Sequence, residues 1–150
     1  MTTREAEIVT YLRLDATLTA LATGGVYAFG ALPESGITDA AGTPTVWTGG
    51  TFHPCAVVHE RLAIPQRQVT DEPTQTVDVA QVIEVYTYAA TQDIAHSLLN
   101  RIYALVQFHR FTAAFQAQFW GGIPAMRAPE LPNIWQIRND YYIKSLRKAA

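Results

Sequence analysis

Soft metal ligands gather in one short stretch of this chain. His53, Cys55 and His59 occupy odd-numbered positions, and alternate residues of a β-strand share one face. Three such side chains could converge on zinc, which takes four ligands, or three and a water molecule, in tetrahedral geometry. His96 and His109 do not complete the set, because they lie on or beside a predicted helix at an unsuitable spacing. We therefore expect no metal and no other cofactor.

Cys55 and a histidine could also form a nucleophile–base pair, which would make the chain a small cytoplasmic hydrolase. A reactive cysteine usually lies at a helix N-terminus or beside a cation, whereas Cys55 begins an apolar strand pattern. Ser35 and Ser97 lack the strand-to-helix turn of a nucleophile elbow. None of the Gly-Gly pairs precedes the Lys-Ser/Thr of a phosphate loop. The sequence thus predicts a protein that is not an enzyme, and the hydrolase is the alternative from another class.

Asp71 and Glu72 are adjacent carboxylates in a polar segment. General acid–base chemistry would need them inside a cleft, whereas a polar turn leaves them solvated. If the segment lined a channel, their negative charge would repel DNA and let it pass without binding. The solvated turn is the simpler interpretation.

The composition describes a weakly charged protein of one domain, residues 1–150. Charged residues make up 16% of the chain, against a usual share of ~25%. A net charge of −2 and a pI near 6.0 argue against nucleic-acid binding, which needs a concentrated basic patch. A single cysteine excludes an internal disulfide, and no apolar run approaches the ~20 residues of a membrane span. We expect a protein made and folded in the cytoplasm, without a membrane partner.

The charge is divided unevenly along the chain. Residues 1–75 hold 4 Lys/Arg and 8 Asp/Glu, and residues 76–150 hold 7 and 5. Opposite charge on two parts of one subunit favours head-to-tail contact between identical copies.

Two long segments show neither helical nor strand periodicity. Residues 30–54 are rich in Gly, Pro, Thr and Ser yet contain Trp47 and Phe52, and residues 62–76 form a second, polar connection. Long loops in compact domains are usually functional or disordered, and disordered segments contain few aromatic residues. We infer that these loops become ordered against a partner, as in a subunit of an assembly.

Helical spacing marks two regions of the chain. A kinked helix ends at Gly24-Gly25, and Asp15, which would interrupt its apolar stripe, is predicted to be a second N-cap. Residues 91–109 predict an amphipathic helix capped by Thr91. Its apolar face is predicted to comprise Ile94, Ala95, Leu98, Leu99, Ile102, Leu105 and Val106.

Strands are predicted at residues 26–29, 55–61, 77–88, 111–119 and 134–146. Residues 111–119 could instead continue the preceding helix, but the alternation of Ala113, Phe115, Ala117 and Phe119 favours a strand. The second and third form a long hairpin, and the third either is apolar on both faces or contains a bulge. Gly121, Gly122 and Pro124 are expected to end the fourth strand. The core candidates of the last strand are Trp135, Ile137 and Tyr141. The predicted class is α+β: an antiparallel sheet of four to five strands, with two helices packed on one face and a long hairpin.

Two sequence patterns extend this interpretation. Asp15, Leu18, Leu21, Gly24, Gly25, Val26 and Tyr27 spell the pattern D-x-x-L-x-x-L-x-x-G-G-V-Y. Near the other end, Asp140, Tyr141 and Ile143 spell D-Y-x-I. With the strand–helix unit between them, these patterns resemble the tail terminator, or tail-completion, family of long-tailed bacteriophages.

The resemblance implies a virion structural protein that is assembled in the host cytoplasm. Such a subunit would form a hexameric ring that caps the tail tube, stops its polymerisation and joins it to the head connector. Its implied partners are further copies of itself, the tail tube protein and a neck or connector protein, while DNA passes through the lumen without specific binding. A tail tube or neck-adaptor subunit is the alternative, because these components have a similar fold.

Within that assembly, five residues are the predicted contacts. Trp47 and Phe52 are expected to anchor an interface, because aromatic residues dominate interface hot spots. Arg67, Asp71 and Glu72 are expected at the subunit or tube interface or facing the lumen.

Overall fold

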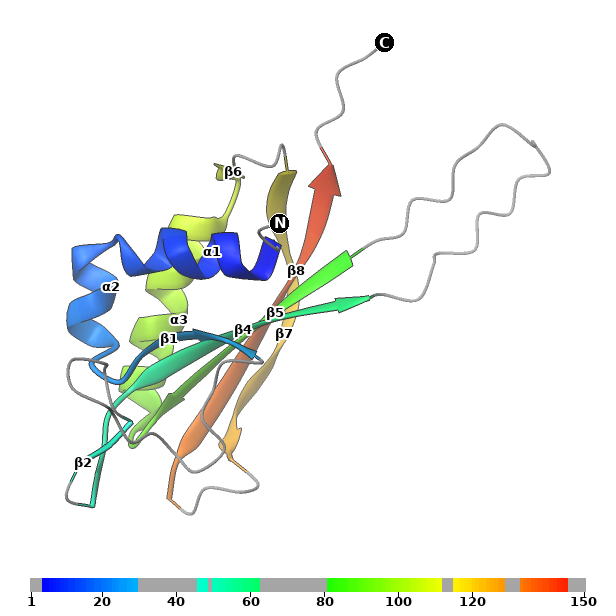
Figure 1. Cartoon of the computed structure of the whole chain (residues 1–150). Helices are drawn as coiled ribbons and strands as arrows, with labels where there is room; N and C mark the ends of the chain where they lie inside the picture. The colour runs from blue at the N-terminus through cyan, green and yellow to red at the C-terminus, as the bar shows by residue number, and fades with distance from the viewer. Residues whose placement is uncertain are drawn as a thin grey trace, which may run out of the picture.

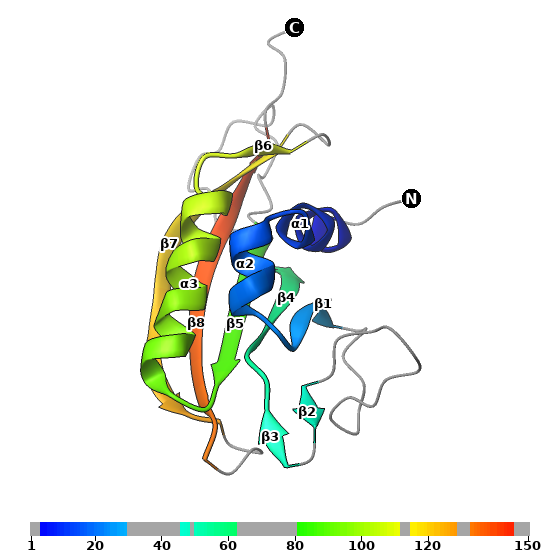
Figure 2. The ribbon, with the colours of Figure 1, turned by 90° about the vertical axis from the view of Figure 1, so that its left-hand side faces the viewer.

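A curved six-stranded sheet forms the centre of the molecule, and three helices cover one of its faces (Figures 1 and 2). The computed structural model describes residues 4–29, 46–48, 50–62, 81–111, 115–128 and 133–145. The helices are α1 (Arg4–Arg13), α2 (Ala16–Leu21) and α3 (Gln92–Val106). In spatial order, the strands are β1 (Gly25–Ala28), β4 (Cys55–Leu62), β5 (Gln81–Ala89), β8 (Trp135–Ser145), β7 (Phe115–Arg127) and β6 (Arg110–Phe111). No described helix is both long and apolar enough to cross a membrane.

The α+β class is confirmed, but the expected purely antiparallel sheet of four to five strands with two helices is wrong. β1 pairs with β4 in parallel, from Gly25 opposite Cys55 to Ala28 opposite Val58. The sheet is therefore mixed, and it has six strands. Alternating apolar residues place a strand in a sheet but do not encode its direction, because both directions bury the same side chains.

The predicted kinked helix is two helices, and Asp15 separates them as predicted. Asp15 has extended backbone angles, and its carboxylate accepts a hydrogen bond from the Leu18 amide at 2.8 Å, so it caps α2. Arg101 of α3 donates two further bonds to that carboxylate, at 2.7 and 2.9 Å. These Arg101 bonds, followed by the Leu18 amide, lower the pKa of Asp15. One residue thus starts α2 and ties it to α3.

The second predicted helix is α3, and its cap is confirmed. The Thr91 hydroxyl accepts a hydrogen bond from the Ile94 amide at 3.3 Å. The buried side chains of α3 are Ala95, Leu98, Leu99, Ile102 and Val106. Ile94, expected on the same face, is instead 38% exposed, because it lies in the first turn near the end of the sheet.

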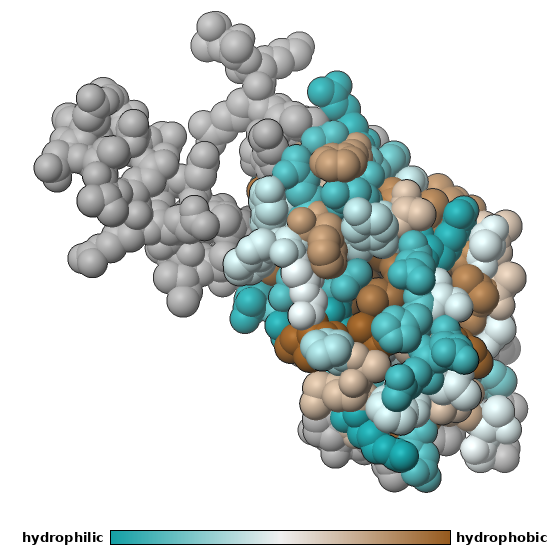
Figure 3. All heavy atoms as spheres, turned by 180° about the vertical axis from the view of Figure 1, so that it is seen from behind, coloured by the Kyte–Doolittle hydropathy of each residue, from teal (hydrophilic) through white to brown (hydrophobic). Residues whose placement is uncertain are grey.

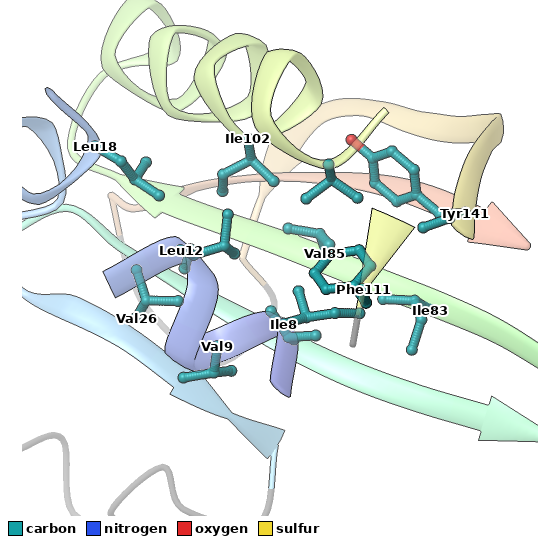
Figure 4. Close-up of a cluster of buried hydrophobic side chains, with 14 of the residues drawn as sticks. Ile8, Val9, Leu12, Leu18, Val26, Ile83, Val85, Ile102, Phe111 and Tyr141 are labelled. Carbon is teal, nitrogen blue, oxygen red and sulfur yellow. The ribbon is translucent and has the colours of Figure 1, made fainter. Parts of the chain in front are cut away.

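The main core lies between the helices and the sheet. Side chains of α1 point towards β4 and β5, and Ile102 approaches from α3 (Figure 4). The main core includes Ile8, Leu12, Leu18, Val26, Ala56, Val58, Ile83, Val85, Phe115 and Tyr141. Ala56 and Val58 face this core as expected from their alternation.

The long hairpin is confirmed over its described part. β4 and β5 pair without a register shift, from Leu62 opposite Gln81 to Cys55 opposite Tyr88. Val82 is buried on one face of β5 and Ile83 on the other, so both faces are apolar and no bulge is needed.

The expected break at Gly121, Gly122 and Pro124 is wrong. β7 continues through these residues to Arg127 and pairs with β8 along the way. Two register shifts, at Phe119/Gly121 and Ile123/Met126, absorb the irregular residues. Bulges let a strand accommodate glycine and proline without ending.

A second, smaller cluster lies on the face of the sheet that the helices leave open. β2 (Trp47–Thr48) and β3 (Thr51–Phe52) form a short antiparallel ribbon within the first predicted loop. Tyr27 and Cys55 alternate with Val26 and Ala56, which face the helices. The cluster comprises Tyr27, Val46, Phe52, Cys55, Ala128 and Ile134.

Candidate interaction surfaces

The residues predicted to make contacts are only partly described. Phe52 is 8% exposed and packs in the second cluster, and the backbone of Trp47 pairs with it across the β2–β3 ribbon. Because Phe52 is buried within its own chain, it can support a neighbouring surface but presents little area of its own. Arg67, Asp71 and Glu72 lie outside the described residues, so their role remains a prediction.

The soft ligands do not converge. Cys55 is buried in the second cluster, whereas the ring of His59 stacks on Phe29 with a centroid distance of 4.0 Å. Among the residues that the structure describes, no three His, Cys, Asp or Glu side chains are placed to hold a metal.

Burial raises the pKa of the Cys55 thiol to about 12, the opposite of what a nucleophile needs. We predict that iodoacetamide labels Cys55 in the native chain on the order of 100-fold more slowly than a free thiol at the same pH. Unfolding in urea should restore the ordinary rate. Rapid labelling of the native chain would contradict this account and revive the hydrolase hypothesis.

Charged side chains occupy the middle of the helix-free face. Glu84 stands opposite His59 and Asp140 in the register and is only 3% exposed. Its carboxylate lies 2.8 Å from Arg61 Nε and 3.5 Å from Arg138 Nη1, and it accepts a hydrogen bond from the Tyr86 hydroxyl. Arg138 Nε is also 3.0 Å from Asp140. The charges of the two arginines and the two carboxylates cancel, so the network has no net charge that would attract an ion. Its ion pairs join β4, β5 and β8.

Most of the exposed large apolar side chains of the described residues lie on β7, on α3 or in the turn that follows α3. β6 pairs only with Phe115 and Gln116, and no described strand pairs beyond them. Figure 3, which views the molecule from behind, on the β7 and α3 side, shows apolar side chains scattered through this polar surface. We define the β7-edge patch by its exposed members Tyr103, Phe108, Phe119, Trp120, Ile123 and Met126. Trp120 is 63% exposed at the first register shift.

Phe108 is held in an unusual conformation at the end of this patch. Its φ is 62° and its side chain is 62% exposed, whereas bulky residues rarely adopt the left-handed region. Its amide donates to the Ala117 carbonyl at 3.3 Å, and its own carbonyl accepts from Gln116 Nε2 at 2.9 Å. The Phe119 amide donates to Gln107 Oε1 at 2.7 Å. Both sides of the turn are thus fastened to β7 while the phenyl ring faces outwards.

The opposite edge of the sheet, at β1, is covered by polar side chains of α1. Arg13 donates twice to the Val26 carbonyl, at 2.6 and 2.9 Å. Glu5 accepts hydrogen bonds from the amides of Phe29, at 3.1 Å, and Glu60, at 2.8 Å. Phe29 itself is 57% exposed. The two edges therefore differ: one is apolar and lacks carboxylates, and the other has an exposed aromatic ring among glutamates.

These features define an α+β protein with a mixed sheet, one helical layer and two dissimilar sheet edges. Among solved structures, the fold is similar to that of a chain in the virion of a native gene transfer agent (GTA) particle. The TM-score is 0.60 at 16% sequence identity, and the match covers 93% of this chain and 92% of the other. Identity this low shows a shared fold. No protein-family model and no curated protein sequence matches the chain.

The β7-edge patch was not predicted from the sequence, because Gly121 and Gly122 were expected to end the strand. A signal was available: Phe119, Trp120, Ile123 and Met126 follow one another closely with no charged residue between them. Exposed edge strands usually carry charges that discourage pairing, so their absence favours a covered edge.

Proposed function

We propose that this chain is a virion structural protein, a tail terminator that forms a ring, caps the tail tube and joins it to the head connector. The observation that carries the proposal is the likeness of nearly the whole chain to a chain of a gene transfer agent virion. The tail-terminator patterns of the sequence, at Asp15 to Tyr27 and Asp140 to Ile143, support the specific assignment.

The mechanism is steric rather than catalytic. Copies close into a ring, with a hexamer as the expected number, and each contact buries ~800 Å² of accessible surface per partner or more. Repetition around the axis gives the ring a multivalent grip on the tail tube protein below it and on a neck protein above. Trp47, Arg67, Asp71 and Glu72 remain the proposed contacts to neighbouring subunits or to the tube, with Phe52 supporting that surface from within its own chain, and DNA passes through the lumen without specific binding.

The closest alternative is a tail tube or neck-adaptor subunit. A tube protein polymerises into long cylinders, whereas a terminator stops at one ring. Negative-stain electron microscopy of the purified chain separates these possibilities: we predict single rings of uniform diameter. Cylinders would assign the chain to the tube, and particles the size of one chain would contradict both assignments.

The alternative from another class is a cytoplasmic hydrolase that uses Cys55. Burial of Cys55 and its raised pKa disfavour that chemistry, and the labelling experiment described above tests it.

A further inference from the structure

We infer that copies of this chain join head to tail, with the β7-edge patch of one copy against the β1 edge of the next, and that Phe108 and Trp120 anchor the contact. This inference rests on the proposed ring and assigns its subunit interface. The occupant of the β7-edge patch is thus a second copy of the same chain.

The first argument is the position of exposed apolar area. Of the large apolar side chains that are exposed in the described residues, six form the β7-edge patch. Phe29, on the far edge, is more exposed than four of them. When two different surfaces meet, each pair of copies still has one free surface of each kind. Further copies therefore add, and they form a ring where the rotation between neighbours closes.

The second argument is charge. No Asp or Glu lies between Gln107 and Ala128, whereas Arg110 and Arg127 are both exposed there. A two-fold contact of this surface with itself would oppose like charges, which is unfavourable. At the β1 edge the carboxylate of Glu5 accepts a hydrogen bond from the Phe29 amide, so a negative charge lies beside Phe29, whereas the Glu60 carboxylate is paired with Arg4 within the chain. The sheet order places β1 and β4, from the first half of the chain, at one edge and β7 and β6, from the second half, at the other.

The third argument is the strained turn. Left-handed conformations of non-glycine residues cluster at functional sites, where the surrounding structure holds them in place. Here hydrogen bonds at Gln107, Phe108 and Phe119 hold the turn, yet the side chain of Phe108 is mostly exposed to solvent. Asparagine adopts this conformation more readily than phenylalanine. An exposed Phe in this conformation is explained if a neighbouring copy buries the ring.

The experiment uses two variants of the full chain, each defective at one edge. Phe108→Asn with Trp120→Asp alters the β7 edge, and Phe29→Lys alters the β1 edge by placing a cation where arginines would approach. Leu14→Lys is the control, because Leu14 is 80% exposed in the turn between α1 and α2 and is not one of the residues of the proposed contact. Circular dichroism should show that all three variants remain folded, and Phe108→Asn alone should keep or raise the melting temperature.

Native mass spectrometry then measures assembly. We expect rings for the wild type and for Leu14→Lys, and at least a tenfold loss of rings for each edge variant alone. A mixture of the two edge variants should form heterodimers and nothing larger, because only one intact contact is possible. Full rings from Phe29→Lys, or no heterodimer in the mixture, would overturn the head-to-tail contact. Wild-type rings that form through these edges but fail to cap tail tubes would refute the proposed function and leave the contact standing; a monomeric wild type would refute both.

Discussion

Replacing Gly122 with alanine lowers the free energy of unfolding by about 1–3 kcal/mol, whereas the same change at Gly121 leaves it nearly unchanged. A Cβ at Gly122 would lie 2.5 Å from the Arg138 carbonyl oxygen and 2.8 Å from Asn139 Oδ1, both on β8. A Cβ at Gly121 would meet nothing within 4 Å. Overpacking against a paired strand typically costs about 1–3 kcal/mol, because the backbone of β8 cannot move aside.

Urea denaturation of both variants provides the measurement, and the adjacent glycine is the matched control. Because β7 must shift for Gly122→Ala to fit, assembly through the β7-edge patch should weaken as well. Equal unfolding free energies for the two variants would show that β7 does not pack on β8 in this register.

Replacing Glu84 with alanine destabilises the fold by about 3 kcal/mol or more. The carboxylate is almost fully buried between Arg61, Arg138 and the Tyr86 hydroxyl, and removal of one partner of a buried ion pair typically costs about 3–5 kcal/mol. The side chain of Arg61 is 51% exposed, so its guanidinium can be solvated by water once Glu84 is removed. This favours a loss of stability at the lower end of that range. The exposed share of Arg138 is only 21%, so its charge stays near the sheet.

Glu60→Ala is the control for Glu84→Ala. Glu60 pairs with Arg4 at 3.4 Å, and both side chains are partly exposed, so the loss should be about 1 kcal/mol or less. Thermal and urea unfolding of the two variants compares a buried network with a surface pair. A loss for Glu84→Ala as small as that for Glu60→Ala would mean that the network does not hold β4, β5 and β8 together.

Local chemistry made the helix caps predictable from the sequence. Asp15 and Thr91 cap helices because their short polar side chains reach the free amides three residues later. The alternation of Ala56 and Val58 likewise located the core face of β4, since a strand has a fixed period of two. Signals of this kind depend only on neighbours in the chain.

The strand direction of β1 and the length of β7 depended on distant neighbours. β1 runs parallel to β4, and the residues of neither strand encode that direction, because both directions bury the same side chains. At Gly122 the bulges that keep β7 paired are set by its fit against β8. The usual effect of glycine and proline on strands therefore predicted that β7 ends at these residues, whereas pairing with β8 allows it to continue.

The predicted contact residues were chosen by composition, and this criterion is incomplete. Phe52 looked exposed because its surroundings are polar in sequence, but the short β2–β3 ribbon folds it onto Cys55 and Tyr27. Trp120 is exposed because it lies at a bulge on the free edge, a position that the residues around it in the sequence do not reveal. Exposure of an aromatic residue is a property of the tertiary structure.

Electron microscopy of tail tubes polymerised with and without this chain tests the central claim most directly. We predict that the chain adds one ring at a single end of each tube and that tube growth stops there, because the ring presents a different surface upwards from the one it places on the tube. Tubes of unchanged length without density at their ends, or copies of the chain distributed along the tube wall, would contradict the account.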